Sequence, residues 1–318
     1  MATNTTPAQI SDAPAALGAV VRQPPAPRMP AASLGIRVKT SPAMRRLVPS
    51  QLVVKRAVRQ GQALWERGAG ERERAMSVMQ TILAGTSRAH EVEELARLHL
   101  IEDRVDSALF WQPWSASMKS DSAALLDKAL AGNRGILLSA CHMGPYYRSL
   151  YALPHESPQP YTVAGPWFFD QPSNDFWGRR LARWRKGALG RPVHSKGSFP
   201  VLRDLLSRGE TVYLFFDLPG RRETRFLGKP AMLADGSARL AIEADAPIVP
   251  MRAERVGHRV RVEVETPLDP REISDVEALH NAVAAVHERW ILDDPAAMAD
   301  PNSFGWDRGA SAQAWIRP

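Results

Sequence analysis

The region before residue 133 shows the hydrophobic spacing of amphipathic helices. Leu98, Ile101, Val105 and Leu109 recur at intervals of three or four positions, and charged residues occupy many of the positions between them. This spacing places the apolar side chains on one face of a helix, which buries that face against other apolar surface. Glycine-containing breaks divide the region into segments. We therefore expect residues 49–132 to form a helical cap on the remainder of the fold.

From residue 133 to residue 295, short apolar runs alternate with helical patterns. The strand candidates are Ile136–Ala140, Tyr161–Ala164, Val193–Ser195, Val212–Asp217, Ile248–Ala253 and Val260–Glu265. The helix candidates are Phe176–Leu189, Phe199–Ser207, Ser237–Ala244 and Val276–Trp290. Strands separated by helices of this length predict an α/β fold with a mixed, mostly parallel sheet that helices cover. The last two strands are expected to pair as an antiparallel hairpin.

The two ends of the chain differ from this pattern. Residues 1–48 are rich in proline, alanine and threonine and show no amphipathic period. Such a composition cannot bury enough apolar surface to offset the entropy lost on ordering, so we expect a disordered tail. Residues 296–318 are predicted to be a C-terminal extension of the α/β core.

Charge and composition exclude several classes of protein. Residues 1–50 hold six Lys or Arg residues against one Asp, so they carry +5 of the net charge of +7. The folded part is close to neutral, and no nucleic-acid-binding motif is present, so we expect no nucleic-acid partner. No apolar run approaches the length of about 18 residues that spans a membrane, and residues 1–20 lack a signal-peptide pattern. We expect a cytoplasmic protein.

The single cysteine, Cys141, allows neither an intrachain disulfide nor a metal site built from several cysteines. We predict no metal site. A free thiol can act as a nucleophile, but cysteine is among the most buried residue types. We therefore interpret Cys141 as a core thiol.

One candidate base follows the first predicted strand of the core. His142 lies directly after Ile136–Ala140 and Cys141, and a His-Met-Gly-Pro corner separates the strand from the helical pattern of Tyr146–Leu153. Ligands of α/β proteins bind beyond the carboxyl ends of the strands, so His142 is placed to act as a general base. A structural histidine is the alternative that the local sequence leaves open.

The predicted helix Phe176–Leu189 combines an aromatic face with a basic one. Trp177 and Trp184 share one face, whereas Arg179 and Arg183 lie on the opposite face. Such a helix can lie on an anionic membrane surface, with its cations on the phosphates. A core helix with a solvated basic face explains the pattern equally well.

Several motifs, in a fixed order, are similar to those of a known family. They are Leu109–Trp111, Arg134–Gly144, Leu206–Asp217, Arg225–Ala231, Gly236–Ala241 and Ala246–Pro250. In this order and spacing the chain resembles the lysophospholipid acyltransferase superfamily, and within it the branch of lipid A lauroyl/myristoyl acyltransferases. The likeness covers residues 70–295.

This resemblance implies a catalytic role for His142. The family transfers a fatty acyl group from a thioester of acyl carrier protein or coenzyme A to a hydroxyl or amine acceptor, without a bound cofactor. Its catalytic histidine is followed five positions later by an acid, but Tyr147 occupies that position here. Restoring the acid with Tyr147→Glu is expected to preserve or raise activity.

Three interpretations follow from this departure. Asp217, which closes the strand Val212–Asp217, orients His142 in place of the missing acid. Alternatively, His142 acts without a carboxylate partner. In the third interpretation the protein is not catalytic and binds acyl lipid or a carrier-protein partner.

The resemblance also suggests residues that bind substrate. Gly144 would allow the backbone to approach the thioester carbonyl, and the N–H groups that begin the next helix would serve as an oxyanion site. Arg221 and Arg222 would hold phosphates of the donor or of a lipid headgroup, and Arg239 would pair with Asp217. Tyr147 completes this set, and Trp167, Phe168 and Phe169 are candidates for the wall of an acyl tunnel. We expect a protein that is peripheral on the inner face of the cell membrane.

Overall fold

The computed structural model describes residues 47–110, 116–153, 159–165 and 190–299, together with the single positions 34, 41, 43 and 169. Nearly all of the predicted N-terminal tail lies outside these residues. The predicted helix Phe176–Leu189 and most of the C-terminal extension also lie outside them.

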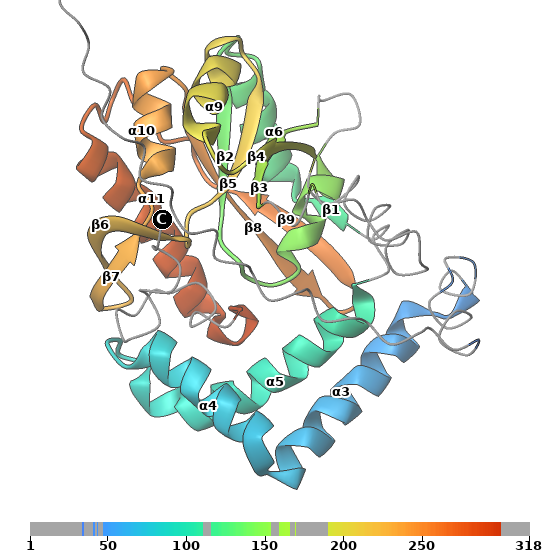
Figure 1. The fold of residues 1–318 in the computed structure, drawn as a ribbon. Coiled ribbons are helices and arrows are strands. Elements are labelled where there is room, and N and C mark those ends of the chain that lie inside the picture. The colour runs from blue at the N-terminus through green and yellow to red at the C-terminus, as the bar shows by residue number, and fades with distance from the viewer. Residues whose placement is uncertain are drawn as a thin grey trace, which may run out of the picture.

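A seven-stranded sheet lies at the centre of the fold (Figure 1). Its strands, in spatial order, are β1 (Ala116–Met118), β9 (Arg259–Val264), β8 (Ile248–Val256), β2 (Ile136–Ala140), β5 (Thr211–Phe215), β3 (Tyr161–Ala164) and β4 (Arg191–His194). β8 and β9 pair antiparallel, and every other neighbouring pair is parallel. The predicted α/β fold with a mixed, mostly parallel sheet is therefore confirmed. All six predicted strands are present, with ends shifted by at most three residues.

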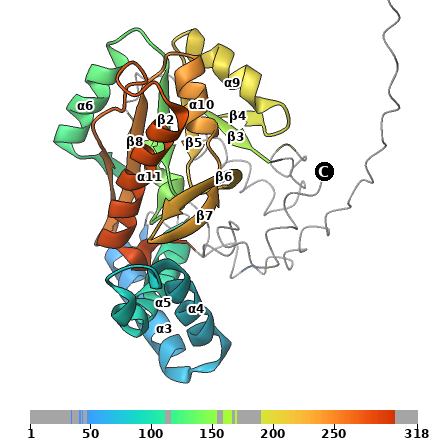
Figure 2. The ribbon, with the colours of Figure 1, turned by 90° about the vertical axis from the view of Figure 1, so that its left-hand side faces the viewer.

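The two faces of the sheet bury different side chains. On β2, Leu137 and the following Cys141 belong to one hydrophobic cluster, and Ile136, Leu138 and Ala140 belong to another. This alternation follows from the two-residue period of a strand. The first face is covered by α9 (Ser198–Ser207), α10 (Gly236–Glu243) and α11 (Val276–Asp293), and the second by α6 (Ser120–Leu130) and the 3₁₀ helix η3 (Tyr146–Ala152), as Figure 2 shows for the long helices.

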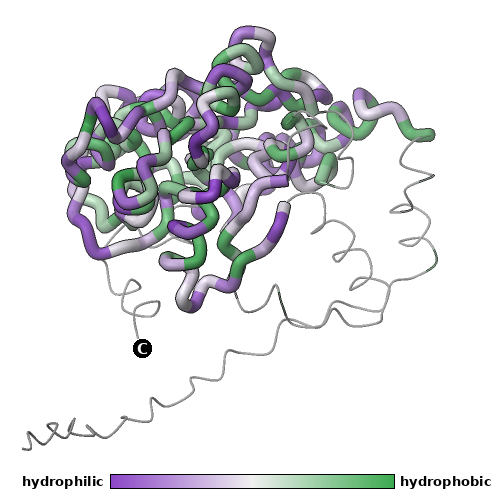
Figure 3. Tube along the Cα trace, turned by 90° about the horizontal axis from the view of Figure 1, so that it is seen from above, coloured by the Kyte–Doolittle hydropathy of each residue, from purple (hydrophilic) through white to green (hydrophobic). Residues whose placement is uncertain are grey.

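Helices α3 (Ser50–Arg67), α4 (Ala69–Leu83) and α5 (Val92–Leu109) pack together beside one end of the sheet (Figure 1). A short 3₁₀ helix, η1 (Ala89–Glu91), precedes α5. Figure 3 shows hydrophilic and hydrophobic positions interleaved along the folded part of the chain, as elements with one buried and one exposed face require. The predicted buried face of α5 is present, because Ile101, Val105 and Leu109 are buried.

β1 and α6, which the helical pattern placed in the cap, lie instead on the sheet. β1 pairs with β9, and the Ser122 hydroxyl of α6 accepts a hydrogen bond of 3.0 Å from the backbone N–H of Val264. Leu126 packs in the cluster on that face of the sheet. The helical cap therefore consists of α3, α4 and α5 within the described residues.

A second, two-stranded sheet was not anticipated. β6 (Pro219–Phe226) and β7 (Lys229–Leu233) form an antiparallel hairpin that turns at Leu227 and Gly228, both with positive φ. The sequence of β6 is strongly charged and only Thr224 and Phe226 are buried along it. Without a longer alternation of apolar and polar residues, the strand gives no recognisable hydrophobic pattern.

Two buried histidines of α11 connect the main sheet and this hairpin to the helix. His287 Nε2 lies 3.0 Å from Ser139 Oγ on β2, and His280 Nε2 lies 2.8 Å from Thr224 Oγ1 on β6. Burial lowers the pKa of both imidazoles to about 4, so both rings are neutral near pH 7. They act as hydrogen-bonded core residues.

We expect the free energy of unfolding to fall as the pH decreases from 6.5 towards 4. In that window the unfolded chain binds protons on His280 and His287 that the folded protein excludes. Each imidazole contributes up to about 1.4 kcal/mol per pH unit. Urea unfolding at pH 7, 6 and 5 should therefore show a weaker pH dependence for His280→Gln than for the unmodified chain. Equal slopes, or a His280 ring that titrates near pH 6.5 by NMR, would contradict this account.

Candidate active site

The carboxyl ends of β2 and β5 bring His142 and Asp217 together. These strands are direct neighbours, with Ala140 opposite Phe215, and the N–H of Phe216 donates to Ala140 O at 2.7 Å. Because the two strands are parallel and end at the same level, the residues that follow them meet at one edge of the sheet.

Asp217 holds His142 at two points. Its Oδ1 accepts a hydrogen bond of 2.9 Å from His142 Nδ1, and its Oδ2 accepts one of 2.9 Å from the backbone N–H of His142. The Asp217 side chain is completely buried, with 0% exposure. Since Nδ1 donates its proton to the carboxylate, the neutral ring carries its lone pair on Nε2. The contact predicted between Asp217 and His142 is present, and it spans adjacent strands.

Two aromatic rings fix the plane of the imidazole. Phe215 is stacked on His142 with ring centroids 3.9 Å apart, and Tyr146 contacts His142 edge-on at 4.9 Å. Burial raises the pKa of Tyr146 to about 12, so its hydroxyl stays protonated near pH 7. Tyr146 is therefore a wall of the site, and the imidazole is the group that can accept a proton.

The segment that ends at Ala299 also positions the His142 loop. The 3₁₀ helix η4 (Pro295–Ala297) precedes a bridge between Met298 and Met143. The N–H of Ala299 donates to His142 O at 2.9 Å, and the N–H of Gly144 donates to Ala297 O at 2.7 Å. This contact leaves no pattern in the sequence, because it uses backbone atoms of small apolar residues. The predicted C-terminal extension therefore begins within the core, since Ala296 and Met298 are buried there.

Gly144 is required by the packing of the loop against β8. Its φ is +56°, and a Cβ at this position would lie 2.5 Å from Ala253 O. Its N–H is bonded to Ala297 O, and the N–H of Tyr146 is bonded to Gly144 O at 2.8 Å. These two donors are thus used within the protein, and the oxyanion site expected at the start of η3 does not include them. Glycine is required at this position because the loop backbone packs closely against β8.

Tyr147 points towards the cap. Its hydroxyl donates to the backbone carbonyl of Asp106 on α5 at 3.0 Å, and its ring lies 4.8 Å from that of Phe110. Burial raises the pKa of the Tyr147 phenol well above its usual value of 10. The Tyr147 side chain therefore connects η3 to α5. The side chain that contacts His142 Nδ1 is that of Asp217.

This geometry reverses our expectation for Tyr147→Glu. A glutamate would be buried next to the Asp106 carboxyl, at a site that favours an uncharged group, so we expect the variant to lose about 2–4 kcal/mol of stability. Tyr147→Phe removes only the hydroxyl and should lose about 1 kcal/mol. Chemical unfolding of both variants at pH 7.5 measures the difference. A Tyr147→Glu variant as stable as the unmodified chain would show that the side chain does not stay buried.

Two of the three predicted arginines, Arg222 and Arg239, pair with carboxylates outside the site. Arg222 Nε lies 3.0 Å from Asp235 and its Nη1 lies 3.3 Å from Glu277, so two carboxylates already share its charge. Arg221 is exposed on β6. The predicted pair between Arg239 and Asp217 is wrong.

Arg239 lies on the outer face of α10, with its side chain 51% exposed. Its guanidinium is 3.9 Å from Glu243 and lies 4.8 Å above the Phe199 ring. The inner face of α10 is formed by small and apolar residues such as Ala238 and Ala241. Helical geometry therefore directs Arg239 away from the buried Asp217.

The structure describes some of the other residues that the sequence singled out. Cys141 is buried, and burial raises the pKa of its thiol, so the interpretation as a core thiol is confirmed. Phe169 stacks on His194 with centroids 5.2 Å apart, but Trp167 and Phe168 lie outside the described residues. Among the described residues there is no group of three His, Cys, Asp or Glu side chains able to hold a metal ion. No helix in the described parts of the chain is long and apolar enough to cross a bilayer.

Sequence comparison assigns this chain to a family. No curated protein matches the sequence. Among solved structures, the 1-acyl-sn-glycerophosphate (LPA) acyltransferase PlsC from Thermotoga maritima is 15% identical, with a TM-score of 0.39 over 80% of this chain and 100% of that chain. The family model for the bacterial lipid A biosynthesis acyltransferases matches residues 111–298, more than half of the chain. This segment contains β2, β5, His142 and Asp217, and the chain belongs to that family.

Proposed function

We propose that this protein transfers an acyl group from a thioester of acyl carrier protein or coenzyme A to a hydroxyl or amine acceptor. His142 is the general base, and Asp217 is the residue that positions it. The observation that carries the proposal is the pair of 2.9 Å hydrogen bonds from His142 to the two oxygens of a buried carboxylate. Such a carboxylate fixes the tautomer of the imidazole and stabilises the imidazolium that forms.

The reaction follows from this arrangement. The acceptor gives its proton to His142 Nε2 as its oxygen or nitrogen attacks the thioester carbonyl. The tetrahedral intermediate then collapses, the carbon–sulfur bond breaks, and the thiol leaves with the proton from the imidazolium. The Asp217 carboxylate faces the positive charge on the ring. No covalent acyl-enzyme is formed, and the buried Cys141 takes no part.

The non-catalytic alternative depended on the replacement of the family's acid by Tyr147. Asp217 lies within hydrogen-bond distance of Nδ1 and supplies a carboxylate of the kind that the family requires. This favours the enzyme over a protein that only binds acyl lipid or a carrier partner.

We further propose that the protein works in the cytoplasm, peripherally on the inner membrane surface. Two observations support this location. The family is that of lipid A biosynthesis acyltransferases, and residues 176–189 combine basic and aromatic side chains in a pattern that suits an anionic membrane surface. Binding to anionic vesicles that weakens with salt would support this location.

Thiol release from acyl thioesters tests the function. Acyl-CoA and acyl carrier protein thioesters of increasing chain length are incubated with the full chain, with water standing in for the acceptor. We expect slow turnover that falls by about 10³-fold or more in His142→Gln. Intact-mass analysis should detect no acylated protein. Thioester turnover that is unchanged in His142→Gln would refute the proposed mechanism.

A further inference from the structure

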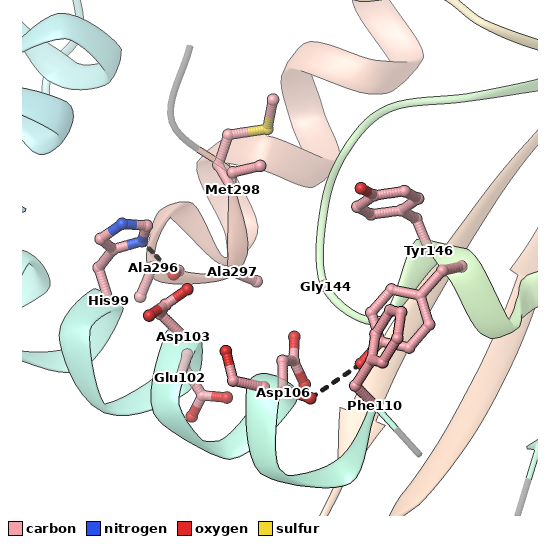
Figure 4. A pocket seen from close by; sticks show the side chains of 13 residues that line it. His99, Glu102, Asp103, Asp106, Phe110, Gly144, Tyr146, Ala296, Ala297 and Met298 are labelled. Atoms are coloured by element: carbon pink, nitrogen blue, oxygen red, sulfur yellow. Dashed lines mark hydrogen bonds between the residues drawn. The ribbon is translucent and has the colours of Figure 1, made fainter. Parts of the chain in front are cut away.

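A pocket lies between the cap and the His142 loop. It has a volume of about 270 Å³ and is bounded by α5, by the start of η3 and by the segment from Ala296 to Ala299. Figure 4 shows Asp103 and Asp106 on the α5 side, with Gly144 and Tyr146 opposite them. The acidic side chains that line it are Glu102, Asp103 and Asp106, and no lysine or arginine of the described residues lines it.

The three carboxylates differ in their surroundings. Glu102 is paired with Arg255, whose Nε lies 2.9 Å away, so its charge is compensated within the protein. Asp103 is 54% exposed and lies 3.8 Å from Arg104, so water and a surface cation share its charge. Asp106 forms no ion pair of this kind, although the charges of Arg255 and Arg148 act on it from a longer distance.

Asp106 is a half-buried carboxyl group with one oxygen that accepts no hydrogen bond. Its Oδ1 is buried and accepts no hydrogen bond, since the Tyr147 hydroxyl donates to the backbone carbonyl of Asp106 instead. Burial, and next the charge of Glu102, raise the pKa of Asp106 to about 7. Buried polar atoms are normally satisfied, so a carboxyl group that lines a pocket and has an unsatisfied oxygen indicates a donor that comes from outside the chain.

The pocket adjoins the catalytic residues without containing them. Tyr146 lines the pocket and also contacts the His142 ring edge-on at 4.9 Å. Gly144, two residues after His142, lines it as well, and Ala299 at its rim donates to His142 O. The pocket therefore lies directly beside the residues that hold the His142 loop and ring.

We propose that this pocket binds a protonated amine of the acyl acceptor, with Asp106 as its counter-ion. The acidic lining favours a cation and opposes a phosphate through like-charge repulsion. An ammonium group would also form a charge-assisted hydrogen bond with the Asp106 carboxylate. The assignment to the acceptor rests on the proposed function, whereas the binding of the amine does not.

Binding of a simple amine tests the proposal independently of turnover. Butylamine and its uncharged counterpart butan-1-ol are titrated into the full chain at pH 8, and binding is followed by saturation-transfer NMR. At this pH the amine is protonated and most Asp106 is ionised. We expect butylamine to bind at least about tenfold more tightly than butan-1-ol, and the affinity to fall by about tenfold in Asp106→Asn.

Matched variants distinguish amine binding at Asp106 from a general effect of acidic charge and from a loss of catalysis. Asp103→Asn removes an exposed acid one turn away and should change the affinity by less than about twofold. His142→Gln should retain amine binding although it loses turnover. Asp106→Asn should keep its thermal midpoint, because it replaces an unsatisfied buried carboxyl with a neutral amide.

Three results would overturn the amine site, and a fourth would overturn its assignment to the acyl acceptor. Equal binding of butylamine and butan-1-ol would exclude a cation site, and equal losses in Asp103→Asn and Asp106→Asn would reduce it to an acidic surface. Undiminished binding in a folded Asp106→Asn would remove Asp106 as the counter-ion. If amine binding depends on Asp106 but the chain releases no thiol from any thioester, the binding site stands and its assignment to an acyl acceptor is overturned.

Discussion

Replacing Asp217 with Asn is expected to lower the turnover number by about 10²- to 10⁴-fold with little change in stability. The carboxylate accepts hydrogen bonds from both His142 Nδ1 and the His142 N–H. An amide of the same shape keeps one acceptor and turns an NH₂ group towards the other donor. The amide therefore favours the tautomer with the proton on Nε2. In that tautomer Nε2 can no longer take a proton from the hydroxyl or amine that receives the acyl group.

Thiol release measured with saturating acyl thioester gives this effect directly, and urea unfolding shows whether the variant is folded. Asp204→Asn on α9 is the control, because Asp204 is an exposed residue that pairs with Arg208 on the same helix. It should leave both turnover and stability within error. A folded Asp217→Asn enzyme of full activity would leave His142 acting without a carboxylate partner.

Gly144→Ala is expected to have the second-largest effect. A Cβ at this residue would meet Ala253 O at 2.5 Å, and the φ of +56° is unfavourable for alanine. The loop must move away from β8, which breaks the bond from the Gly144 N–H to Ala297 O and shifts His142. We expect a loss of about 2–4 kcal/mol in unfolding free energy and a decrease in turnover of about 10²-fold, since displacements near 1 Å have such effects.

Gly257→Ala is the matched control for Gly144→Ala. Gly257 also has a positive φ, of +64°, but a Cβ there would meet no atom within 4 Å. It should lose about 1 kcal/mol of stability and no activity. If both variants lose the same stability and both retain turnover, close packing against β8 does not position the catalytic loop.

The sequence predicts the central part of this site because strand ends follow simple rules. A buried apolar run identifies β2 and β5, and parallel pairing places the residues after Ala140 and Phe215 at one edge of the sheet. Asp217 could therefore be named as the partner of His142 although the family's usual acid is absent. The alternation of β2 likewise predicts that Cys141 and His142 face opposite sides, as the stacking of His142 on Phe215 shows.

Other parts of the site depend on contacts that leave no pattern in the sequence. Tyr147 could not be oriented because η3 is a 3₁₀ helix, whose side-chain directions differ from those of the helical spacing we read. Ala297 and Ala299 hold the His142 loop through backbone atoms alone. Asp106 appears as one more charged residue of an amphipathic helix, and only the tertiary packing of η3 against α5 buries it.

A double-mutant cycle on His142 and Asp217 tests most directly whether the two residues act as one catalytic unit. Turnover of acyl thioester is measured for the unmodified chain, His142→Gln, Asp217→Asn and the double variant, after each is shown to be folded. If Asp217 acts only by positioning His142, the double variant should be no slower than His142→Gln alone. Losses that multiply in the double variant would show that Asp217 acts independently of the imidazole, and would contradict the proposed pair.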